Sequence, residues 1–176
     1  MGTGMRRVAS GLVIVSAAAA LAACGQPAAP EGGAAATTSA AATPAATPTA
    51  PVDPAKAALL ASLPAPYNTG DLANGQQQFQ LCRSCHTITE GGANMTGPNL
   101  YGLFGRTAGT VEKFRYSEPV KAAGFAWDAE KLNQWLADPR GFLPGNRMSF
   151  MGVKDAKDRT DLIAYLKVET GYKPGG

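Results

Sequence analysis

The chain has 176 residues, and its 16 lysines and arginines against 13 acidic residues give a formal net charge of +3. Arg6 and Arg7 lie in a leader-like segment, so the rest is nearly neutral and lacks the basic face that nucleic-acid binding requires. Most charged residues follow residue 66, which predicts one globular domain of about 110 residues behind a sparsely charged N-terminal third.

The first 23 residues have the pattern of an export signal. Two arginines precede an almost unbroken apolar stretch over residues 8–23, which is shorter than the roughly 20 apolar residues of a membrane-spanning helix. The stretch ends in LAAC and resembles the lipobox of bacterial lipoproteins, whose cysteine is acylated. That resemblance implies a lipid on Cys24 and anchoring to a membrane on the periplasmic side of a bacterial envelope. A plain secretory signal, with Cys24 incidental, remains the alternative.

Residues 24–66 are predicted to form a flexible tether. From Gly25 to about Pro51 the chain is rich in alanine, proline and threonine and almost free of charge, so it has little apolar surface to pack. A coil of about 40 residues spans roughly 35 Å root-mean-square. It either lets a domain swing between partners or simply clears the envelope surface. A short helix is predicted over 54–63, with Asp53 as its N-cap.

The remaining residues, 67–176, are predicted to form an all-α domain, because no segment has the alternating pattern of a strand. In the first helix, Phe79 is expected to face inward and Gly75 to allow another helix to approach closely. Asp128 is a suitable N-cap for a helix with an apolar stripe. Gly171 is placed to end the last helix. The predicted helices cover 71–82, 117–124, 129–137 and 158–170.

Residues 82–86 read Cys-Arg-Ser-Cys-His, the C-x-x-C-H signature of covalent haem attachment. Both thiols add to haem vinyl groups as thioethers, and their spacing places the two sulfurs along one haem edge. His86 follows at once, so the same turn points its imidazole at the iron. The motif therefore predicts one haem c held by Cys82, Cys85 and His86.

Two other uses of the cysteine pair are excluded by the residues available. A structural zinc site needs four protein ligands, and the chain has a single histidine beside two clustered cysteines. A thioredoxin-like redox pair needs a βαβ setting, which the surrounding sequence lacks. The single histidine also excludes bis-histidine ligation of the iron within this chain.

A methionine is the predicted sixth ligand of the iron. Met148 ends the turn-rich sequence Pro-Gly-Asn-Arg-Met, a loop suited to projecting a side chain onto the second haem face. Met95 lies only nine residues after His86, and Met151 is the near competitor of Met148. Methionines fill gaps in cores more often than they bind metals, and this is the role expected of Met95 and Met151.

From about Gly70 to Thr170 the chain resembles a class I cytochrome c of the mitochondrial and purple-bacterial type. The resemblance rests on the order and spacing of CRSCH at 82–86, GPNLYGLFGR at 97–106, Tyr116-Ser117, Trp127 and PGNRM at 144–148. It implies the cytochrome c fold, with four to five helices around one covalently bound haem. It also implies that the first and last helices cross, with Gly75 and Phe79 against Tyr165.

The resemblance implies further haem contacts. Pro98 offers its backbone carbonyl to the second ring nitrogen of His86, which orients the imidazole. Arg106, Tyr116 and Trp127 hydrogen-bond or neutralise the haem propionates, which are partly buried acids.

Three positions depart from the usual pattern of that family. Asn146 stands where a hydroxyl usually lies near the methionine ligand. Trp135 replaces a tyrosine that commonly packs against that methionine, and Val120 replaces a frequent asparagine. The changes at Trp135 and Val120 make the pocket less polar, and pocket polarity affects the redox potential, which is expected to stay positive.

The function implied is one-electron transfer rather than catalysis, because histidine–methionine ligation leaves the iron no open position. A monomer that shuttles between a cytochrome bc complex and a terminal oxidase or photosynthetic reaction centre fits this chemistry. The alternatives are a dedicated electron-transfer subunit of one dehydrogenase or oxidase, and a haem peroxidase or gas sensor with a labile sixth site.

Four cations border the haem edge by the same resemblance. They would steer the protein towards an acidic partner, an effect sensitive to salt, although an ordinary solvated surface remains the alternative. These residues are Arg83, Arg140, Arg147 and Lys154.

Overall fold

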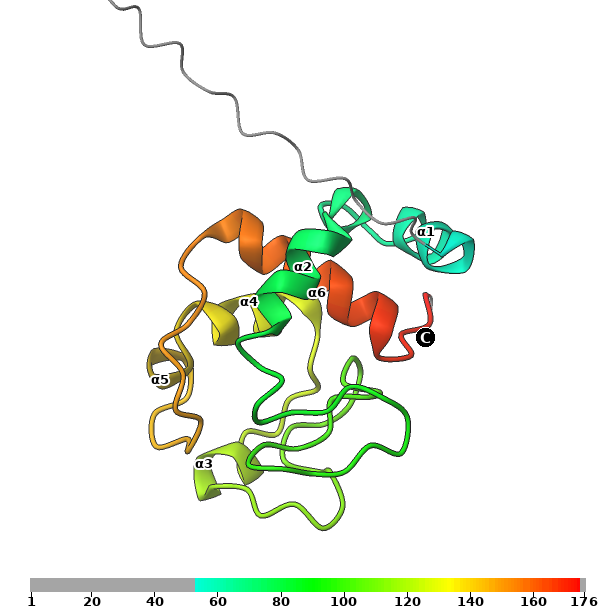
Figure 1. The fold of residues 1–176 in the computed structure, drawn as a ribbon. Coiled ribbons are helices and arrows are strands. Elements are labelled where there is room, and N and C mark those ends of the chain that lie inside the picture. The colour runs from blue at the N-terminus through cyan, green and yellow to red at the C-terminus, as the bar shows by residue number, and fades with distance from the viewer. Residues whose placement is uncertain (1–52, 175–176) are drawn as a thin grey trace, which may run out of the picture. The chain divides into compact units, whose positions relative to one another are not determined.

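The computed structural model describes residues 53–174, and this part of the chain is helical (Figure 1). Its elements are α1 (Pro54–Ala61), the 3-10 helix η1 (Tyr67–Thr69), α2 (Leu72–Phe79), α3 (Glu118–Lys121), α4 (Ala129–Ala137), α5 (Pro139–Phe142) and α6 (Ala156–Glu169). Between residues 53 and 174 the β-type pairing is limited to one isolated bridge, Thr107 to Ala126. The predicted all-α class is confirmed.

The predicted export signal, Cys24 and the tether up to residue 52 lie outside the described residues. Among the helices of residues 53–174, none has the length and apolar character needed to cross a membrane.

Helix α6 packs against α2 and α4, and α2 crosses it at a glycine (Figure 1). A Cβ at Gly75 would lie 2.6 Å from the Cβ of Tyr165 and would overlap the backbone of Asp161. One turn further along α2, the ring centroids of Phe79 and Tyr165 are 5.8 Å apart. The predicted crossing of Gly75 and Phe79 against Tyr165 is therefore confirmed, and any larger residue at position 75 would push the two helices apart.

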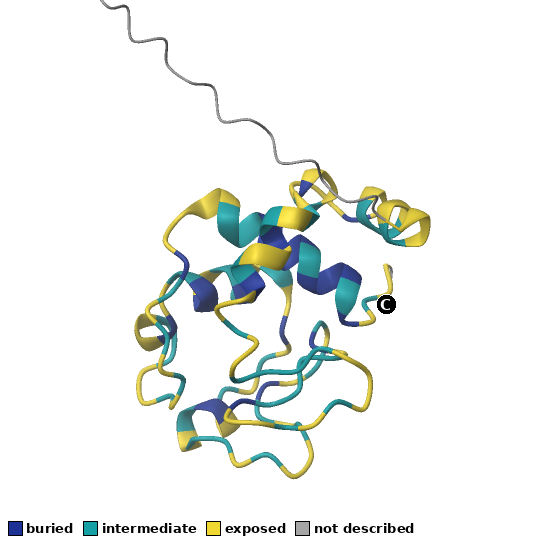
Figure 2. Ribbon diagram, viewed as in Figure 1, coloured by how far each residue is buried: buried dark blue, intermediate teal, exposed yellow. Residues whose placement is uncertain are grey.

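The core lies between α6, α4 and the loops on the far side of α4 (Figure 2). Because α6 is covered on several faces, its apolar residues are almost entirely buried. Most of the buried cluster comes from α4, α6 and the loops before α4: Leu103, Trp127, Leu132, Trp135, Leu136, Leu162, Ile163 and Leu166.

Several helix ends differ from the prediction. Helix α1 ends at Ala61 instead of residue 63, and α3 ends at Lys121 instead of residue 124. Two further ends differ for local reasons. Helix α6 begins at Ala156, two residues before the predicted start, because the carboxylate of Asp155 caps it by accepting from Asp158 N at 2.9 Å. Helix α2 ends at Phe79 instead of residue 82. Beyond it the chain tightens into turns, with Cys82 N donating to Phe79 O at 2.8 Å.

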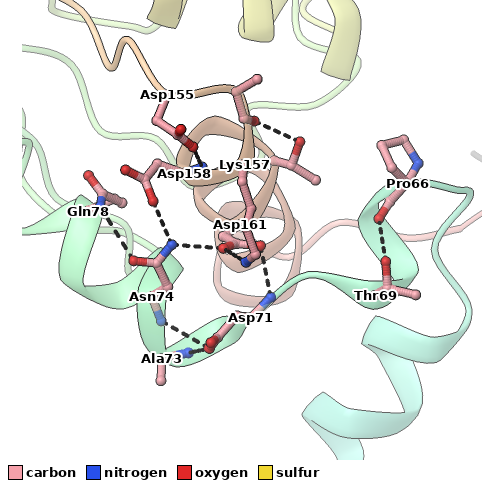
Figure 3. A network of polar contacts seen from close by, with 12 residues as sticks. Pro66, Thr69, Asp71, Ala73, Asn74, Gln78, Asp155, Lys157, Asp158 and Asp161 are labelled. Carbon is pink, nitrogen blue, oxygen red and sulfur yellow. Dashed lines mark hydrogen bonds and ion pairs between the residues drawn. The ribbon is translucent and has the colours of Figure 1, made fainter. Parts of the chain in front are cut away.

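A buried carboxylate ties the start of α2 to α6 (Figure 3). Asp161 is 1% exposed and accepts hydrogen bonds from Asp71 N at 3.0 Å, Asn74 Nδ2 at 2.7 Å and Lys157 Nζ at 2.5 Å. Burial alone raises the pKa of the Asp161 carboxyl. The bonds from Asn74, Lys157 and Asp71 outweigh burial and hold that pKa below its usual value.

We expect Asp161→Asn to lower the free energy of unfolding by about 2 kcal/mol near pH 7, because the amide turns an NH2 group towards buried donors. The wild-type carboxylate stabilises the fold above the ordinary aspartate pKa of about 3.9, and this contribution is lost as the pH falls through the lower folded-state pKa. Denaturant unfolding from pH 7 down to pH 2 tests this. The gap between the two proteins should shrink with falling pH, while the exposed-site control Glu118→Gln stays near wild type. A gap independent of pH would contradict this role.

Helix α1 packs against α6, although it belongs to the segment predicted to be tether. Asp53 caps α1 by accepting from Ala55 N at 2.8 Å, as predicted. Lys56 Nζ on α1 lies 2.6 Å from Glu169 Oε1 on α6, and Leu63 beyond the helix is 3% exposed. The compact part of the described chain therefore includes residues 53–66.

A buried lysine joins both ends of the described chain. The side chain of Lys167 on α6 lies among aromatic rings, with Nζ 3.6 Å from the ring centroid of Tyr172, 4.3 Å from that of Phe104 and 6.0 Å from that of Tyr67. Burial lowers the pKa of Lys167. Cation–π attraction substitutes here for a carboxylate partner.

Candidate functional site

The cysteine–histidine motif lies on the turns that follow α2. Cys85 N and His86 N both donate to Cys82 O, at 3.0 Å each, so one tight turn brings the three side chains together. Both cysteines are half-buried free thiols. Burial, assisted by the neighbouring Cys85, raises the pKa of the Cys82 thiol to about 11. The motif is therefore a reduced thiol pair with a histidine at its end, as thioether formation requires.

The His86 ring is oriented by the loop that follows it. His86 Nδ1 lies 2.7 Å from Pro98 O. A carbonyl oxygen only accepts, so Nδ1 carries the proton and donates, which leaves Nε2 with a free lone pair. Burial lowers the pKa of the His86 imidazole against the opposing effect of the Pro98 bond, so the ring is neutral at pH 7. A neutral imidazole with one nitrogen hydrogen-bonded is the form that binds metals.

Gly97 lies directly against this ring. A Cβ at position 97 would be 2.6 Å from His86 Nε2 and 2.7 Å from Nδ1, closer than real contacts allow. Gly97 N also donates to Cys85 O at 2.9 Å, which joins the loop to the cysteine turn. Only glycine leaves room for the imidazole at this point.

We expect Gly97→Ala to lower the yield of haem-loaded protein several-fold, because the added methyl displaces the His86 ring from its bond with Pro98. Covalent haem per milligram of purified protein measures the effect. Gly102→Ala is a stringent control, because it strains a backbone with positive φ but nothing lies near the added Cβ. Equal yields for Gly97→Ala and wild type would contradict the close fit.

Met148 differs from the other two described methionines. Met95 and Met151 are 48% and 77% exposed, so the core-filling role expected of them is wrong. Met148 is partly buried and packs against the hydrophobic core. Of the three, Met148 alone therefore lies in an apolar environment.

Asn146 shapes the loop that carries Met148. Its Nδ2 donates to Pro139 O at 2.7 Å and Leu143 O at 2.9 Å, and its Oδ1 accepts from Met148 N at 2.8 Å. Gly145 before it has φ +82°, which few other residues adopt. Asn146 thus fixes the backbone of Met148 relative to α5. The sequence showed only that Asn146 stands where the family usually has a hydroxyl, and it did not reveal this role.

The three predicted propionate partners lie near one another. Arg106 is half-buried and donates to two backbone carbonyls, Tyr101 O at 2.9 Å and Asn99 O at 3.1 Å. Burial raises the pKa of the Tyr116 hydroxyl, and the charge of the nearby Arg106 lowers it. Trp127 N donates to Arg106 O at 2.9 Å, so the backbones of these two residues are adjacent.

Trp135 lies in an aromatic group at the edge of this site. Its ring centroid is 5.5 Å from that of Trp127 and 6.1 Å from that of Phe142. Val120, the other apolar departure from the family pattern, is also buried. The interior beside the site is therefore apolar, as expected from these substitutions.

Ser117 is a site residue for which the sequence predicts only a helix-capping role. The sequence predicts a helix cap there, but the Ser117 side chain makes no capping bond, and its buried Oγ has no hydrogen-bond partner among the described residues. It lines a groove of about 550 Å3 with Tyr116, Arg115, Gly145 and Arg147. A buried hydroxyl without a partner indicates that a polar group belongs beside it. The Tyr116-Ser117 match to the family pattern was the signal available in the sequence.

These groups fit haem c. The site provides two free thiols, a neutral imidazole with a free Nε2, and a partly buried thioether. Within residues 53–174 the Ser117 hydroxyl has no hydrogen-bond partner and the half-buried Arg106 guanidinium has no carboxylate partner, which suits the two propionates. The side chains at this site are therefore of the chemical types needed to hold haem c.

Comparisons with known proteins agree with this chemistry. The sequence model of the cytochrome c family matches residues 72–168. Cytochrome c2 of Blastochloris viridis is 45% identical over 109 residues, which cover 62% of this chain and 86% of that protein. Cytochrome c of Stellaria longipes is 44% identical over 105 residues, covering 59% of this chain and 97% of that protein.

A solved structure agrees in fold. Cytochrome cH from Methylobacterium extorquens matches with a TM-score of 0.52 and 41% sequence identity, over 56% of this chain and 98% of that chain. These relatives are electron-transfer proteins with covalently bound haem c, and they are not enzymes. The chain therefore belongs to the cytochrome c family, as a haem-c protein of electron transfer.

Proposed function

We propose that this chain is a membrane-tethered mono-haem cytochrome that carries single electrons between a cytochrome bc complex and a terminal oxidase or photosynthetic reaction centre. The observation that carries the proposal is the bond from His86 to Pro98, which presents a free Nε2 directly after the paired thiols. When bound, haem c supplies an iron centre that gains and loses one electron.

Each residue of the site has a defined task in this proposal. Cys82 and Cys85 form the two thioethers, and His86 Nε2 and the Met148 sulfur bind the iron. With both iron ligands supplied by the protein, no substrate would have direct access to the metal. Histidine–methionine ligation raises the reduction potential, which suits this place in an electron-transfer chain.

Further residues position these ligands or balance charge. Pro98 orients His86, and Asn146 holds the Met148 backbone. Arg106, Tyr116, Trp127 and Ser117 meet the propionates, whose charge would be costly in a dry pocket without such partners. The apolar group around Trp135 excludes water and favours the less charged, reduced centre.

A potentiometric titration of the purified protein tests the proposed function. We expect one reversible one-electron transition at a positive midpoint potential. A two-electron transition, or a negative midpoint, would rule out the proposed place between a bc complex and an oxidase.

Lipid anchoring at Cys24 is part of the proposal, supported by the lipobox-like LAAC sequence. Bacterial c-type cytochromes of this kind are typically periplasmic, and residues 53–174 contain no helix that could anchor them. Several acyl chains on one residue give stable attachment, whereas a single chain gives marginal binding.

We expect Cys24→Ser, exported behind a signal that is still cleaved, to move the cytochrome from the membrane fraction to the soluble fraction. Haem staining of the two fractions measures the change, and an exposed-site variant such as Lys173→Gln should stay with the membrane. If Cys24→Ser remains membrane-bound after its signal is removed, lipid anchoring at this residue is wrong.

A further inference from the structure

The loop that carries Met148, residues 147–152, makes few hydrogen bonds to the rest of the described chain. Its backbone bonds stay local: Met148 N donates to Asn146 Oδ1 at 2.8 Å, and Phe150 N donates to Met148 O at 3.1 Å. The Arg147 side chain adds one bond to a backbone carbonyl elsewhere in the fold. A loop bonded so sparsely can open without global unfolding, so its position depends on how its ends are held.

The far end of this loop lies against the C-terminal end of α4 (Figure 1). Val153 N donates to Leu136 O at 2.8 Å, and Val153 is 6% exposed. Gly152 has φ +85°, and a Cβ there would overlap Ala137 O, so only glycine lets the chain pass this close to α4. Residues 153–155, between the loop and α6, are named the return segment below.

One side chain of α6 holds the return segment in place. Arg159 Nη1 lies 2.8 Å from Val153 O, 2.9 Å from Lys154 O and 3.3 Å from Asp155 O. The same guanidinium donates through Nε to Asn133 Oδ1 on α4 at 2.8 Å. A single side chain thus joins α6, α4 and the three successive carbonyls that follow the Met148 loop.

The contacts of Arg159 are those of a residue that places backbone. It takes part in none of the ion pairs found within residues 53–174, and its acceptors are three main-chain carbonyls and one side-chain amide. Arginine has five N–H donors in a rigid plane, so one side chain can bond two elements at once. A lysine ammonium is a compact point charge on a flexible stem, and it cannot bond Asn133 and the row of carbonyls together.

We propose that Arg159 is a positioning residue that holds the Met148 loop closed and thereby sets how often the sixth iron position opens. The inference rests on the proposed electron-carrier function, in which Met148 binds the iron, and adds a residue that controls this bond from outside the haem site. Arg159 acts on Met148 only through the backbone that follows it. When the loop swings away, the bonds from Arg159 to the return segment break, and their loss makes opening unfavourable.

Amide hydrogen exchange of the reduced, haem-loaded protein measures the opening of the return segment. The protein is the full mature chain carrying Cys24→Ser, exported behind a cleavable signal. In Arg159→Lys the amide of Val153 should exchange about tenfold faster than in the wild type, because the positive charge is kept while the bonds to the carbonyls and to α4 are weakened or lost. Local opening and global unfolding are then separated by two control variants.

Asp161→Asn is the control for global stability, because it weakens the crossing of α2 and α6 without touching the return segment. It should speed exchange at the fully buried Ile163 of α6 and leave Val153 at its wild-type rate. Arg140→Lys makes the same substitution at an exposed arginine of α5, and it should change neither amide.

Imidazole binding to the oxidised protein measures the opening of the sixth position itself. Because imidazole reaches the iron only after Met148 has left, the binding rate should level off at high imidazole concentration, where loop opening limits it. This limiting rate should rise several-fold in Arg159→Lys and keep its wild-type value in Asp161→Asn and Arg140→Lys. Asn133→Ala should give part of the increase, and adding it to Arg159→Lys should give no more, because lysine no longer bonds residue 133.

A Val153 amide that exchanges at the wild-type rate in Arg159→Lys, or that responds to Asp161→Asn as strongly as Ile163 does, would overturn the role of Arg159. Equal limiting rates of imidazole binding in the wild type and Arg159→Lys would also overturn it and leave the carrier function standing. The carrier function fails in a different way, because a wild-type rate that never levels off would mean that the sixth position is open.

Discussion

The double variant Cys82→Ser, Cys85→Ser is expected to contain no covalently attached haem. Serine cannot form the thioether, and both thiols of this turn are free and lie with His86 around Cys82 O. The variant should also be much less stable. Haem that binds the folded state and not the unfolded state adds its binding free energy to the stability of the fold, and the variant loses this contribution. We expect complete loss of the haem signal on a denaturing gel.

Extraction into acidified organic solvent distinguishes covalent from non-covalent haem in the same samples. Any haem in the double variant should be extractable, while that of the wild type stays with the polypeptide. Cys24→Ser is the matched control, since it removes the remaining cysteine and should keep full covalent haem. A double variant that retains covalent haem would show that these thiols are not the attachment points.

The second large effect is expected for Met148→Ala, which removes the sulfur from the proposed sixth position. The midpoint potential should fall by tenths of a volt, within the roughly 0.8 V range that axial ligands cover. The reduced variant should also bind carbon monoxide, because the iron gains an open position. Potentiometry and visible spectra of the reduced protein measure both changes.

Met151→Ala and Met95→Ala are the controls for this change, because both side chains are exposed, whereas Met148 packs against the core. Both should keep the wild-type potential and ignore carbon monoxide. If Met151→Ala behaves as expected of Met148→Ala, the ligand assignment moves to residue 151.

Features with local causes were predictable from the sequence. The caps at Asp53 and Asp128 and the helix over 129–137 follow from short-range patterns, and the structure has them. The crossing at Gly75 was implied by the family resemblance, and the structure has it too. The sequence predicts the start of α6 at residue 158, but in the structure Asp155 caps the helix, which begins at Ala156.

Features that join distant residues were not predictable where the family resemblance did not imply them. The Asp161 network links residues 90 positions apart along the chain, and the rings around Lys167 come from three separate segments. At the site, the Ser117 hydroxyl is notable for lacking a partner, which no sequence pattern records. The packing of α1 on α6 was missed because its alanine-rich sequence resembles the preceding tether.

The most direct test of the account is the visible spectrum of the reduced wild-type protein with and without carbon monoxide. The account predicts a low-spin spectrum that the gas leaves unchanged, because His86 and Met148 fill both axial positions. A spectrum that shifts readily under carbon monoxide would mean an open sixth position, and the protein would then be a gas-binding or catalytic haem protein and not an electron carrier.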